Sequence, residues 1–410
     1  MKPLDQRPSV GPERPFTPTR PEVDSRGWRL YRPTLPLVSL RVLIPGGRLN
    51  ETSPGLTCLA DRLLMRGAGA RNADAFSGLL EQNAISLSVS TGATATTVSL
   101  SCHTRQLELG TELLRDLLHE PHFADNEVNR ERTLTLGDIA QAQDEPEHLA
   151  REEAARRFHT GPLATPRLGT EESLAALGAE ELRASWQQRR REALIVAAGA
   201  IEALPDLGLP LARPRPLRAA DPACSGRFEV PRPDAPQSVV RVLFGGWACD
   251  DQELPAARMA ALALGGTFTS RLNTLLREEK GWTYGARLWV EPALGRAAFQ
   301  TSVVAEHTRE TVDLLREQLE LARREGLTEA ERIKAIAAHR TRVVSAQQTV
   351  GSTSSALAEL ALQGRTVDDL ALELASPPSL EQLNAALNRL DLDRAVLVLV
   401  GDPEQTRETR

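Results

Sequence analysis

The feature that most constrains this fold is a succession of segments that occurs twice along the chain. Residues 38–47 read VSLRVLIPGG, and residues 238–246 read SVVRVLFGG. Each is a β-branched, apolar run that ends at a pair of glycines, which is typical of a buried strand followed by a turn. The second copy begins 200 residues after the first in a chain of 410 residues. This repetition predicts two halves that fold alike.

Further segments recur in the same order in both halves: a helix, two strands of alternating pattern, an amphipathic helix, a helix with an acidic first turn, and a final strand closed by glycine. The predicted ranges are 54–66, 84–91, 95–102, 105–119, a helix from 125 and 193–199, then 255–264, 283–290, 297–304, 310–324, a helix from 328 and 395–401. The fold class predicted is therefore α+β, with two similar domains. Each is expected to be a mostly antiparallel sheet with helices packed on one face.

Proline content marks the boundary between the two copies. Residues 203–236 carry eight prolines, which exclude a regular helix or an inner strand because proline lacks a backbone N–H. We therefore predict a Pro/Arg-rich N-terminal arm at 1–23, a first domain at 24–204, a semi-rigid linker at 205–236 and a second domain at 237–410. The proline content of the arm favours a flexible or extended segment.

Composition excludes several classes of function. The net charge is −6, from 49 basic and 55 acidic residues, whereas a nucleic-acid-binding protein needs a concentrated positive field. No apolar stretch approaches the ~20 residues of a membrane span. The N-terminus lacks the apolar core of a secretory signal, and the four cysteines form no Cys-x-x-Cys pair. We expect a cytoplasmic protein with free thiols and neither a nucleic-acid nor a membrane partner.

Three stretches carry motifs at defined places in the repeat. They read GLTCLADRLLMRG at 55–67, LATPRLGTE at 163–171, and GGTFTSRL at 265–272 followed by LREEKGWTY at 276–284. With the order of segments over about residues 24–405, these motifs resemble the pitrilysin/insulinase family of zinc metallopeptidases. The resemblance implies a two-domain fold, with a zinc helix in the first domain and a substrate-binding signature in the second.

The zinc motif itself is degenerate. The family places His-x-x-Glu-His on a helix, and those positions read Cys58, Asp61 and Arg62 here, while a further Glu ligand falls on Asp138. Cys and Asp can bind zinc, but the guanidinium group of Arg has no free lone pair and stays protonated. We therefore expect no metal and no catalytic residue in this chain. Our hypothesis is that Arg62 and Asp138 form an ion pair in place of the metal; the alternative is a solvated arginine on a helix face.

The second domain retains the residues that the family uses to hold substrate. The resemblance assigns this role to Arg277 and Tyr284, on either side of a turn at Gly281. A guanidinium and a phenol can together donate hydrogen bonds to a peptide carbonyl and stabilise negative charge that develops on it. The alternative is a surface arginine beside a tyrosine of the sheet. Tyr31 and Tyr284 are the only tyrosines, so the coincidence with the family position favours the functional role.

These features imply the non-catalytic subunit of a two-chain peptidase. Zinc is expected in a homologous partner subunit with an intact His-x-x-Glu-His, and the substrate is expected to be a peptide. The alternatives are a structural scaffold of the same fold, a peptide-binding protein without a peptidase partner, and an enzyme that uses Cys58, Asp61 and Asp138, which Arg62 opposes. Resemblance to the alpha subunit of the mitochondrial processing peptidase is weaker, because the glycine pair at 265–266 is only a stub of that subunit's glycine-rich loop.

Overall fold

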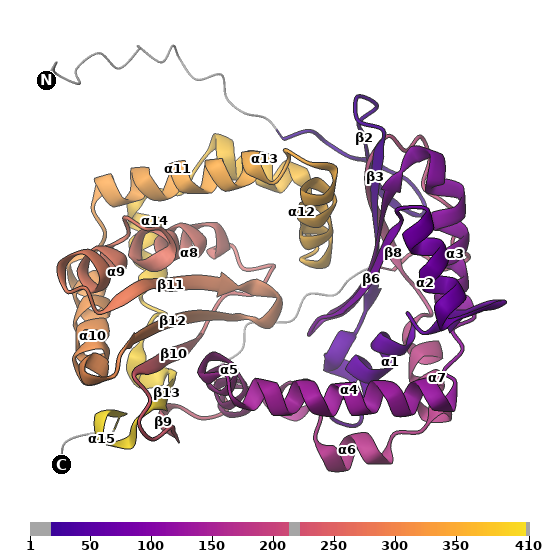
Figure 1. Ribbon diagram of the computed structural model, residues 1–410. Coiled ribbons are helices and arrows are strands. Elements are labelled where there is room, and N and C mark those ends of the chain that lie inside the picture. The colour runs from indigo at the N-terminus through magenta and orange to yellow at the C-terminus, as the bar shows by residue number, and fades with distance from the viewer. Residues whose placement is uncertain (1–17, 213–221, 407–410) are drawn as a thin grey trace, which may run out of the picture.

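The computed structural model of the chain describes residues 18–212 and 222–406. Two large sheets dominate it, one in each half (Figure 1). In spatial order, the first contains β1 (Glu22–Val23), β2 (Gly27–Tyr31), β8 (Leu194–Gly199), β3 (Leu37–Pro45), β7 (Ala95–His103) and β6 (Ser86–Thr91). The second contains β9 (Gly226–Pro231), β13 (Val396–Gly401), β10 (Gln237–Gly245), β12 (Arg296–Val304) and β11 (Thr283–Glu291).

The two sheets have the same strand order once β1 is set aside. The pairs β2–β8 and β9–β13 are parallel and occupy the same place in each sheet, and the remaining neighbours are antiparallel. Small two-residue strands, β4 (Gly67–Ala68) and β5 (Arg71–Asn72), form a separate hairpin. The predicted α+β class is confirmed, and the predicted strands lie within a few residues of the observed ones.

Helices and strands follow one another along the chain in a similar order in the two halves. The first half contains α1 (Leu56–Leu63), α2 (Ala73–Gln82), α3 (Leu107–His119), α4 (Asp125–Gln143), α5 (Pro146–Phe158), α6 (Glu171–Ala176) and α7 (Ala179–Arg189). The second contains α8 (Leu254–Ala261), α9 (Arg271–Asn273), α10 (Thr308–Glu325), α11 (Glu329–Ser345), α12 (Val350–Leu362), α13 (Val367–Ala375), α14 (Leu380–Leu387) and α15 (Pro403–Thr406). Two π-helical segments, η4 (Leu262–Gly266) and η5 (Thr274–Glu279), flank α9.

The alternating side chains of the central strands explain how the helices pack. Val240, Val242 and Phe244 of β10 belong to the core that its own helices α8, α10 and α14 cover. Val239 and Leu243 point to the opposite face, where they pack against α5 from the first half. Successive side chains of a strand face opposite sides of the sheet, so the side chains of β10 contribute to two hydrophobic cores.

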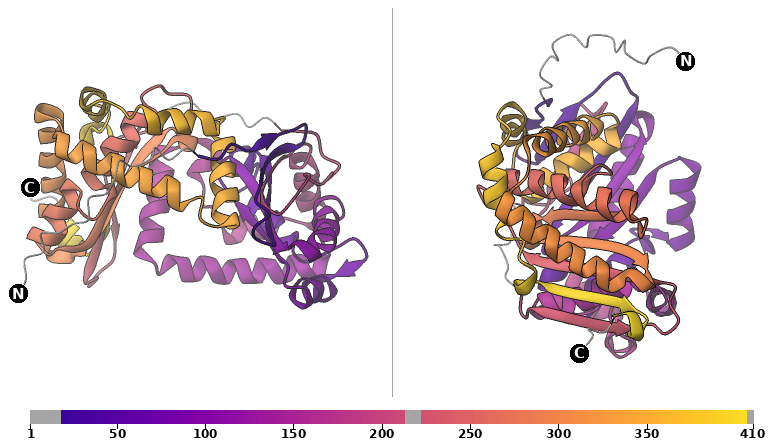
Figure 2. Two further views of the ribbon diagram at one scale, coloured as in Figure 1. Left: turned by 90° about the horizontal axis from the view of Figure 1, so that it is seen from above. Right: turned by 90° about the vertical axis from the view of Figure 1, so that its left-hand side faces the viewer.

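The first sheet repeats this arrangement with the roles of the halves exchanged. Even-numbered residues 38–44 of β3 face α1, α3 and α7, whereas Leu43 packs against α12 of the second half. Ser354 of α12 also hydrogen-bonds Ser39 of β3 at 2.8 Å. Each sheet is thus covered by its own helices on one face, as predicted, and by one helix of the other half on the other face. The left view of Figure 2 shows the two halves side by side, and Figure 1 labels α5 near the second sheet and α12 near the first.

The predicted linker is shorter than its proline content indicated. β9 lies inside the predicted range 205–236 and pairs in parallel with β13 as the edge strand of the second sheet. An edge strand tolerates proline because one side of it has no ladder to donate to, and Pro231 ends this strand. β1 likewise lies inside the predicted arm. Residues 1–17 of the arm and 213–221 of the linker lie outside the described residues.

Within the part of the chain that the structure describes, no helix is long and apolar enough to cross a membrane. The four cysteines are free, as predicted. Cys58, Cys102 and Cys249 are buried, and only Cys224 is exposed.

The contact of α5 with the second sheet gives the first prediction. His159, directly after α5, lies with its Nε2 atom 2.7 Å from Nη1 of Arg296 on β12. Burial, and then the charge of Arg296, lower the pKa of His159 to about 4 from 6.5. As the pH falls, His159 is therefore protonated in the unfolded chain before it is protonated in the folded one. The stabilising contribution of neutral His159 is complete above pH 6.5 and is lost as the pH falls toward 4.

We expect the free energy of unfolding to decrease as the pH is lowered from 6.5 toward 4. The variant His159→Gln should show a weaker dependence on pH. Denaturant unfolding at several pH values measures it. His339, whose pKa burial also lowers to about 4, should leave a residual slope. His148→Gln, on the same helix, is the control. An identical pH dependence in wild type and His159→Gln would contradict the prediction.

Candidate functional site

The degenerate zinc motif lies on α1, which is almost wholly buried. The helix begins after Gly55, whose φ of 84° favours glycine, and the carboxylate of Glu51 accepts a hydrogen bond from the Gly55 N–H at 2.7 Å. Cys58 is buried, and burial raises the pKa of its thiol. A thiol with a raised pKa stays protonated at neutral pH, and the protonated form is a poor metal ligand and nucleophile.

Asp61, at the position of the family's general base, has no free oxygen. It is 2% exposed and accepts hydrogen bonds from Thr91 at 2.8 Å and Thr96 at 2.7 Å. Its other carboxylate oxygen accepts from Arg189 Nη2 at 2.8 Å, and Arg189 also donates to Thr96. Because all these donors hold the carboxylate inside the fold, Asp61 is not placed to activate a water molecule. Sequence analysis missed Arg189, which lies 128 residues away at the end of α7.

Arg62 is the residue of α1 that points toward α4. It forms an ion pair with Asp138 and donates to Thr135 Oγ1 at 3.0 Å. The hypothesised Arg62–Asp138 pair is therefore present. Glu131, which sequence analysis did not single out, lies 4.0 Å from Arg62 Nη1 and also pairs with Arg66. Arg62 of α1 and Arg66, just after the helix, thus pair with two carboxylates of α4.

This set of side chains does not fit zinc. A bound cation at the motif would face the fixed positive charges of Arg62 and Arg189, and Asp61 and Asp138 already accept from those two residues. Among the described residues, no group of three or more His, Cys, Asp or Glu side chains is arranged to hold a metal ion. His119 and His122 lie close together in sequence, but each ring contacts a backbone carbonyl oxygen, that of Leu207 and that of Gly69.

Arg277 and Tyr284, the predicted substrate-binding pair, lie on adjacent segments of the second half. Arg277 belongs to η5, and Tyr284 to the start of β11. Gly281, with φ of 69°, lies in the turn between them. The pairing of β11 with β12 shifts register between Thr283 and Ala286, so Tyr284 lies at a bulge. Bulges re-aim side chains and are frequent beside functional sites.

The side chains of this region are unusually exposed for their type. Tyr284 is 89% exposed, and Phe268, in the GGTFTSRL segment, is 70% exposed. The guanidinium of Arg277 lies 4.8 Å from the centre of the Phe268 ring, and its ion-pair partner is the adjacent Glu278. Sequence analysis missed Phe268, although an aromatic residue inside a polar turn motif is a usable signal. We refer to Phe268, Arg277 and Tyr284 as the Arg–Tyr surface.

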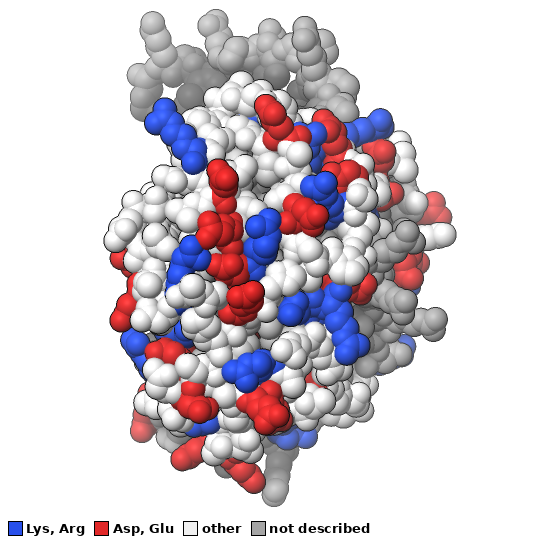
Figure 3. Space-filling model, turned by 90° about the vertical axis from the view of Figure 1, so that its right-hand side faces the viewer, with Lys and Arg blue, Asp and Glu red and all other residues white. Residues whose placement is uncertain are grey.

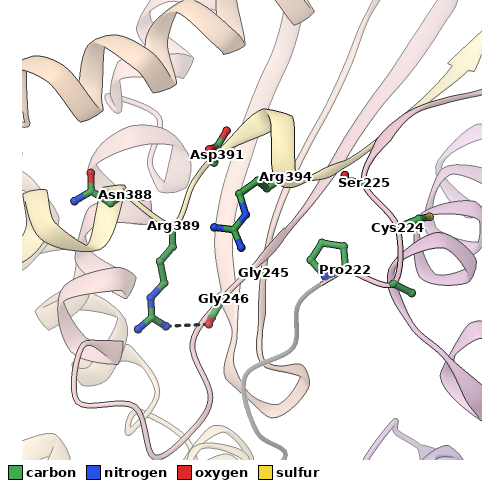
Figure 4. A pocket seen from close by; sticks show the side chains of 10 residues that line it. Pro222, Cys224, Ser225, Gly245, Gly246, Asn388, Arg389, Asp391 and Arg394 are labelled. Carbon is green, nitrogen blue, oxygen red and sulfur yellow. Dashed lines mark hydrogen bonds between the residues drawn. The ribbon is translucent and has the colours of Figure 1, made fainter.

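A polar cavity elsewhere in the second half lies where the linker meets the sheet (Figure 4). Arg389 reaches across it and donates to the carbonyl oxygen of Gly246 at 3.1 Å. The charge of Arg389 is matched by Asp251 and Glu253, at 2.7 and 3.0 Å. These bonds are sufficient to explain the arginine as a structural tie, so we assign no function to the cavity.

The outer face of the first half carries charges of both signs. Figure 3 shows Lys and Arg side chains interspersed with Asp and Glu, without a broad field of one sign on that face. This agrees with the near balance of charge in the sequence.

Two family models match the chain, one in each half. Residues 30–171 match the model for Insulinase (Peptidase family M16), and residues 193–338 match the model for the Peptidase M16 inactive domain. The chain belongs to peptidase family M16. The resemblance predicted from the three motifs is confirmed, and the second half matches the inactive domain of M16.

Relatives of known sequence in family M16 carry two kinds of name. The "Non-peptidase homolog YmxG" of Helicobacter pylori is 26% identical over 257 residues, so the chain spans 58% of the length of that relative. The "Uncharacterized zinc protease SCO5738" of Streptomyces coelicolor is 24% identical over 378 residues, which cover 85% of this chain and 82% of that one. One of these names describes a non-peptidase and the other a zinc protease.

Solved structures show the same M16 fold. An M16 inactive domain from Pseudomonas fluorescens superposes with a TM-score of 0.82 at 20% identity, covering 95% of this chain and 99% of that one. A protease from Helicobacter pylori superposes with a TM-score of 0.78 at 14% identity, covering 93% of this chain and 100% of that one.

Proposed function

We propose that this chain is the non-catalytic, zinc-less subunit of a two-chain M16 peptidase. In this proposal it supplies Arg277 and Tyr284 to the active site of a homologous partner with an intact His-x-x-Glu-His. The observation that carries the proposal is a contrast between the halves. Asp61 and Arg62 of the motif helix are held in ion pairs within the chain, with Arg189 and Asp138. Tyr284, in contrast, is 89% exposed, and the only ion-pair partner of Arg277 among the described residues is its neighbour Glu278.

The chemistry of the Arg–Tyr surface supports a role in binding peptides. The guanidinium and the phenol are hydrogen-bond donors that suit a peptide carbonyl and the negative charge that develops on it during hydrolysis. Exposed Phe268 and Tyr284 also leave apolar area in water, which a partner or a substrate would cover. The proposed substrates are short or unfolded peptides. We further infer that the chain arose by internal duplication, which its repeated strand order supports.

The experiment uses the full chain, alone and mixed with an M16 protein of the same organism that carries His-x-x-Glu-His. We expect the chain alone to hold no stoichiometric zinc and to lack peptidase activity, because Arg62 and Arg189 place positive charge at the motif. The mixture is expected to elute as a heterodimer with one zinc and to cleave a fluorogenic peptide. Zinc measured by mass spectrometry, size-exclusion chromatography with light scattering, and peptide cleavage test these points.

Two outcomes would contradict the proposal. One zinc per isolated chain, lost in Cys58→Ser, would make the motif a metal site. Failure of the two chains to associate, together with no gain in activity, would favour the alternative of a scaffold or peptide-binding protein without a peptidase partner.

A further inference from the structure

A second cavity lies at the junction of the two halves, among α8, α11, α12 and α13. Its volume is about 330 Å³, and Leu30 of β2 and Thr19 close it from the side of the first half. None of its lining residues belongs to the motif helix α1 or to the Arg–Tyr surface. Cavities for small molecules occur preferentially at such junctions between domains.

One part of the wall is apolar. Leu30, Val343, Leu357 and Val367 line the cavity and are buried. Leu357 also belongs to the core that joins α12 to the first sheet. A molecule with an apolar body would therefore find a preformed apolar surface to which both halves contribute.

The other part of the wall carries an arginine with an unused donor. Arg365 is 8% exposed, and its Nη2 atom pairs with Glu373. Its Nη1 atom is buried and has no hydrogen-bond partner. A buried guanidinium N–H without an acceptor destabilises the fold, because it has lost its hydrogen bonds to water and no protein acceptor replaces them.

The charges around the cavity leave one positive charge in excess. Arg258, Arg342 and Arg365 line it together with a single carboxylate, Glu359, and Glu373 lies behind Arg365. Arg258 donates to Gln363 at 2.7 Å, and Gln363 donates to Glu359, so this part of the network is satisfied. The three arginines disfavour a bound cation. A single excess charge beside apolar walls suits a monoanion better than a polyphosphate.

His339 completes the polar wall without changing this balance. Burial, followed by the charges of Arg258, Arg342 and Arg365, lowers its pKa to about 4, so the ring is neutral at pH 7. Its Nε2 atom is buried without a hydrogen-bond partner and lies 3.8 Å from Glu373. A second unused polar atom therefore borders the same cavity.

We propose that this cavity binds a small carboxylate with an apolar body, whose carboxylate accepts from Arg365 Nη1 and whose apolar part packs against Leu357 and Val367. Leu30 of the first half lines the same cavity, so the ligand would contact both halves and stabilise their junction. The proposal does not depend on a peptidase partner.

The test titrates the full chain with hexanoate and with two probes of equal length, hexanol and hexylamine. Isothermal titration calorimetry gives affinity and stoichiometry, and the ring signals of ¹³C-labelled histidine report whether His339 is affected. We expect saturable binding of one hexanoate per chain, weaker binding of hexanol by about tenfold or more, and no binding of hexylamine. Absence of saturable hexanoate binding, or equal binding of hexylamine, overturns the proposal.

Two variants locate the site. Arg365→Gln combined with Glu373→Gln removes both charges of the buried pair at nearly constant volume, and should weaken hexanoate binding by about tenfold or more. Ala356→Phe fills the cavity from a half-buried lining position without touching a charge, and should abolish binding. Arg340→Gln, on α11 but outside the lining, is the control and should bind as wild type. If the double variant does not fold, Ala356→Phe alone decides, and unchanged hexanoate binding in it contradicts the proposal.

Discussion

Replacing Arg277 by Ala is expected to lower kcat/KM of the proposed two-chain peptidase by about 100-fold, the usual effect of losing one donor to a developing oxyanion. Tyr284→Phe, which removes only the phenolic O–H, should cost between about tenfold and 100-fold. Tyr284 is 89% exposed and Arg277 is part-exposed, and neither belongs to a hydrophobic core of the described residues. Steady-state cleavage of a fluorogenic peptide by the reconstituted complex measures the loss.

Matched controls exist for both substitutions. Tyr31 is the only other tyrosine and lies on β2 of the first sheet, so Tyr31→Phe should leave turnover unchanged. Arg324 is exposed and pairs with the adjacent Glu325, as Arg277 pairs with Glu278, so Arg324→Ala controls for loss of a surface arginine. The complex should still form in all four variants. Wild-type turnover of Arg277→Ala or Tyr284→Phe in an intact complex would remove these residues from substrate binding.

The second large effect is expected from Arg189→Met, which should destabilise the fold by about 3 to 5 kcal/mol. The Arg189 and Asp61 side chains are 7% and 2% exposed, so the substitution leaves a carboxylate charge buried without its cation. Thr91 and Thr96 still donate to Asp61 but carry no charge. Chemical denaturation of the isolated chain gives the free energy of unfolding.

The companion variant Arg62→Ala removes one partner of a part-exposed ion pair. Comparison of its free energy of unfolding with that of Arg189→Met shows how much of the destabilisation depends on burial. Arg62 and Asp138 form an ion pair between part-exposed side chains, and such pairs contribute about 1 kcal/mol or less. Combining Arg189→Met with Asp61→Asn should recover part of the stability, because no buried charge then remains. Equal effects of Arg189→Met and Arg62→Ala, or strict additivity in the double variant, would contradict a buried pair at the motif.

Local sequence patterns predicted the secondary structure well. The alternating strands 95–102 and 297–304 correspond to β7 and β12, and the acidic turns at Asp125 and Thr328 mark the starts of α4 and α11. At α11, the Thr328 side chain accepts from the Glu331 N–H while Glu331 reaches back, which is a capping box. Such signals depend on neighbours within a few residues, so they can be read from sequence alone. The proline-rich linker was misjudged, because β9 depends on a distant partner, β13.

Sequence by itself determined the twofold succession of strands and helices, the loss of the zinc-binding residue types and the placement of Arg277 and Tyr284 in a recognisable signature. Only the tertiary structure decided that α5 and α12 each cover the sheet of the other half. It also decided that Arg189 forms an ion pair with Asp61, and that Nη1 of Arg365 has no hydrogen-bond partner at the junction of the two halves. Hydrophobic periodicity depends on residues that are close together in sequence, so it can be recognised without the tertiary structure. Burial and charge pairing, in contrast, depend on which distant segments the packed core brings together.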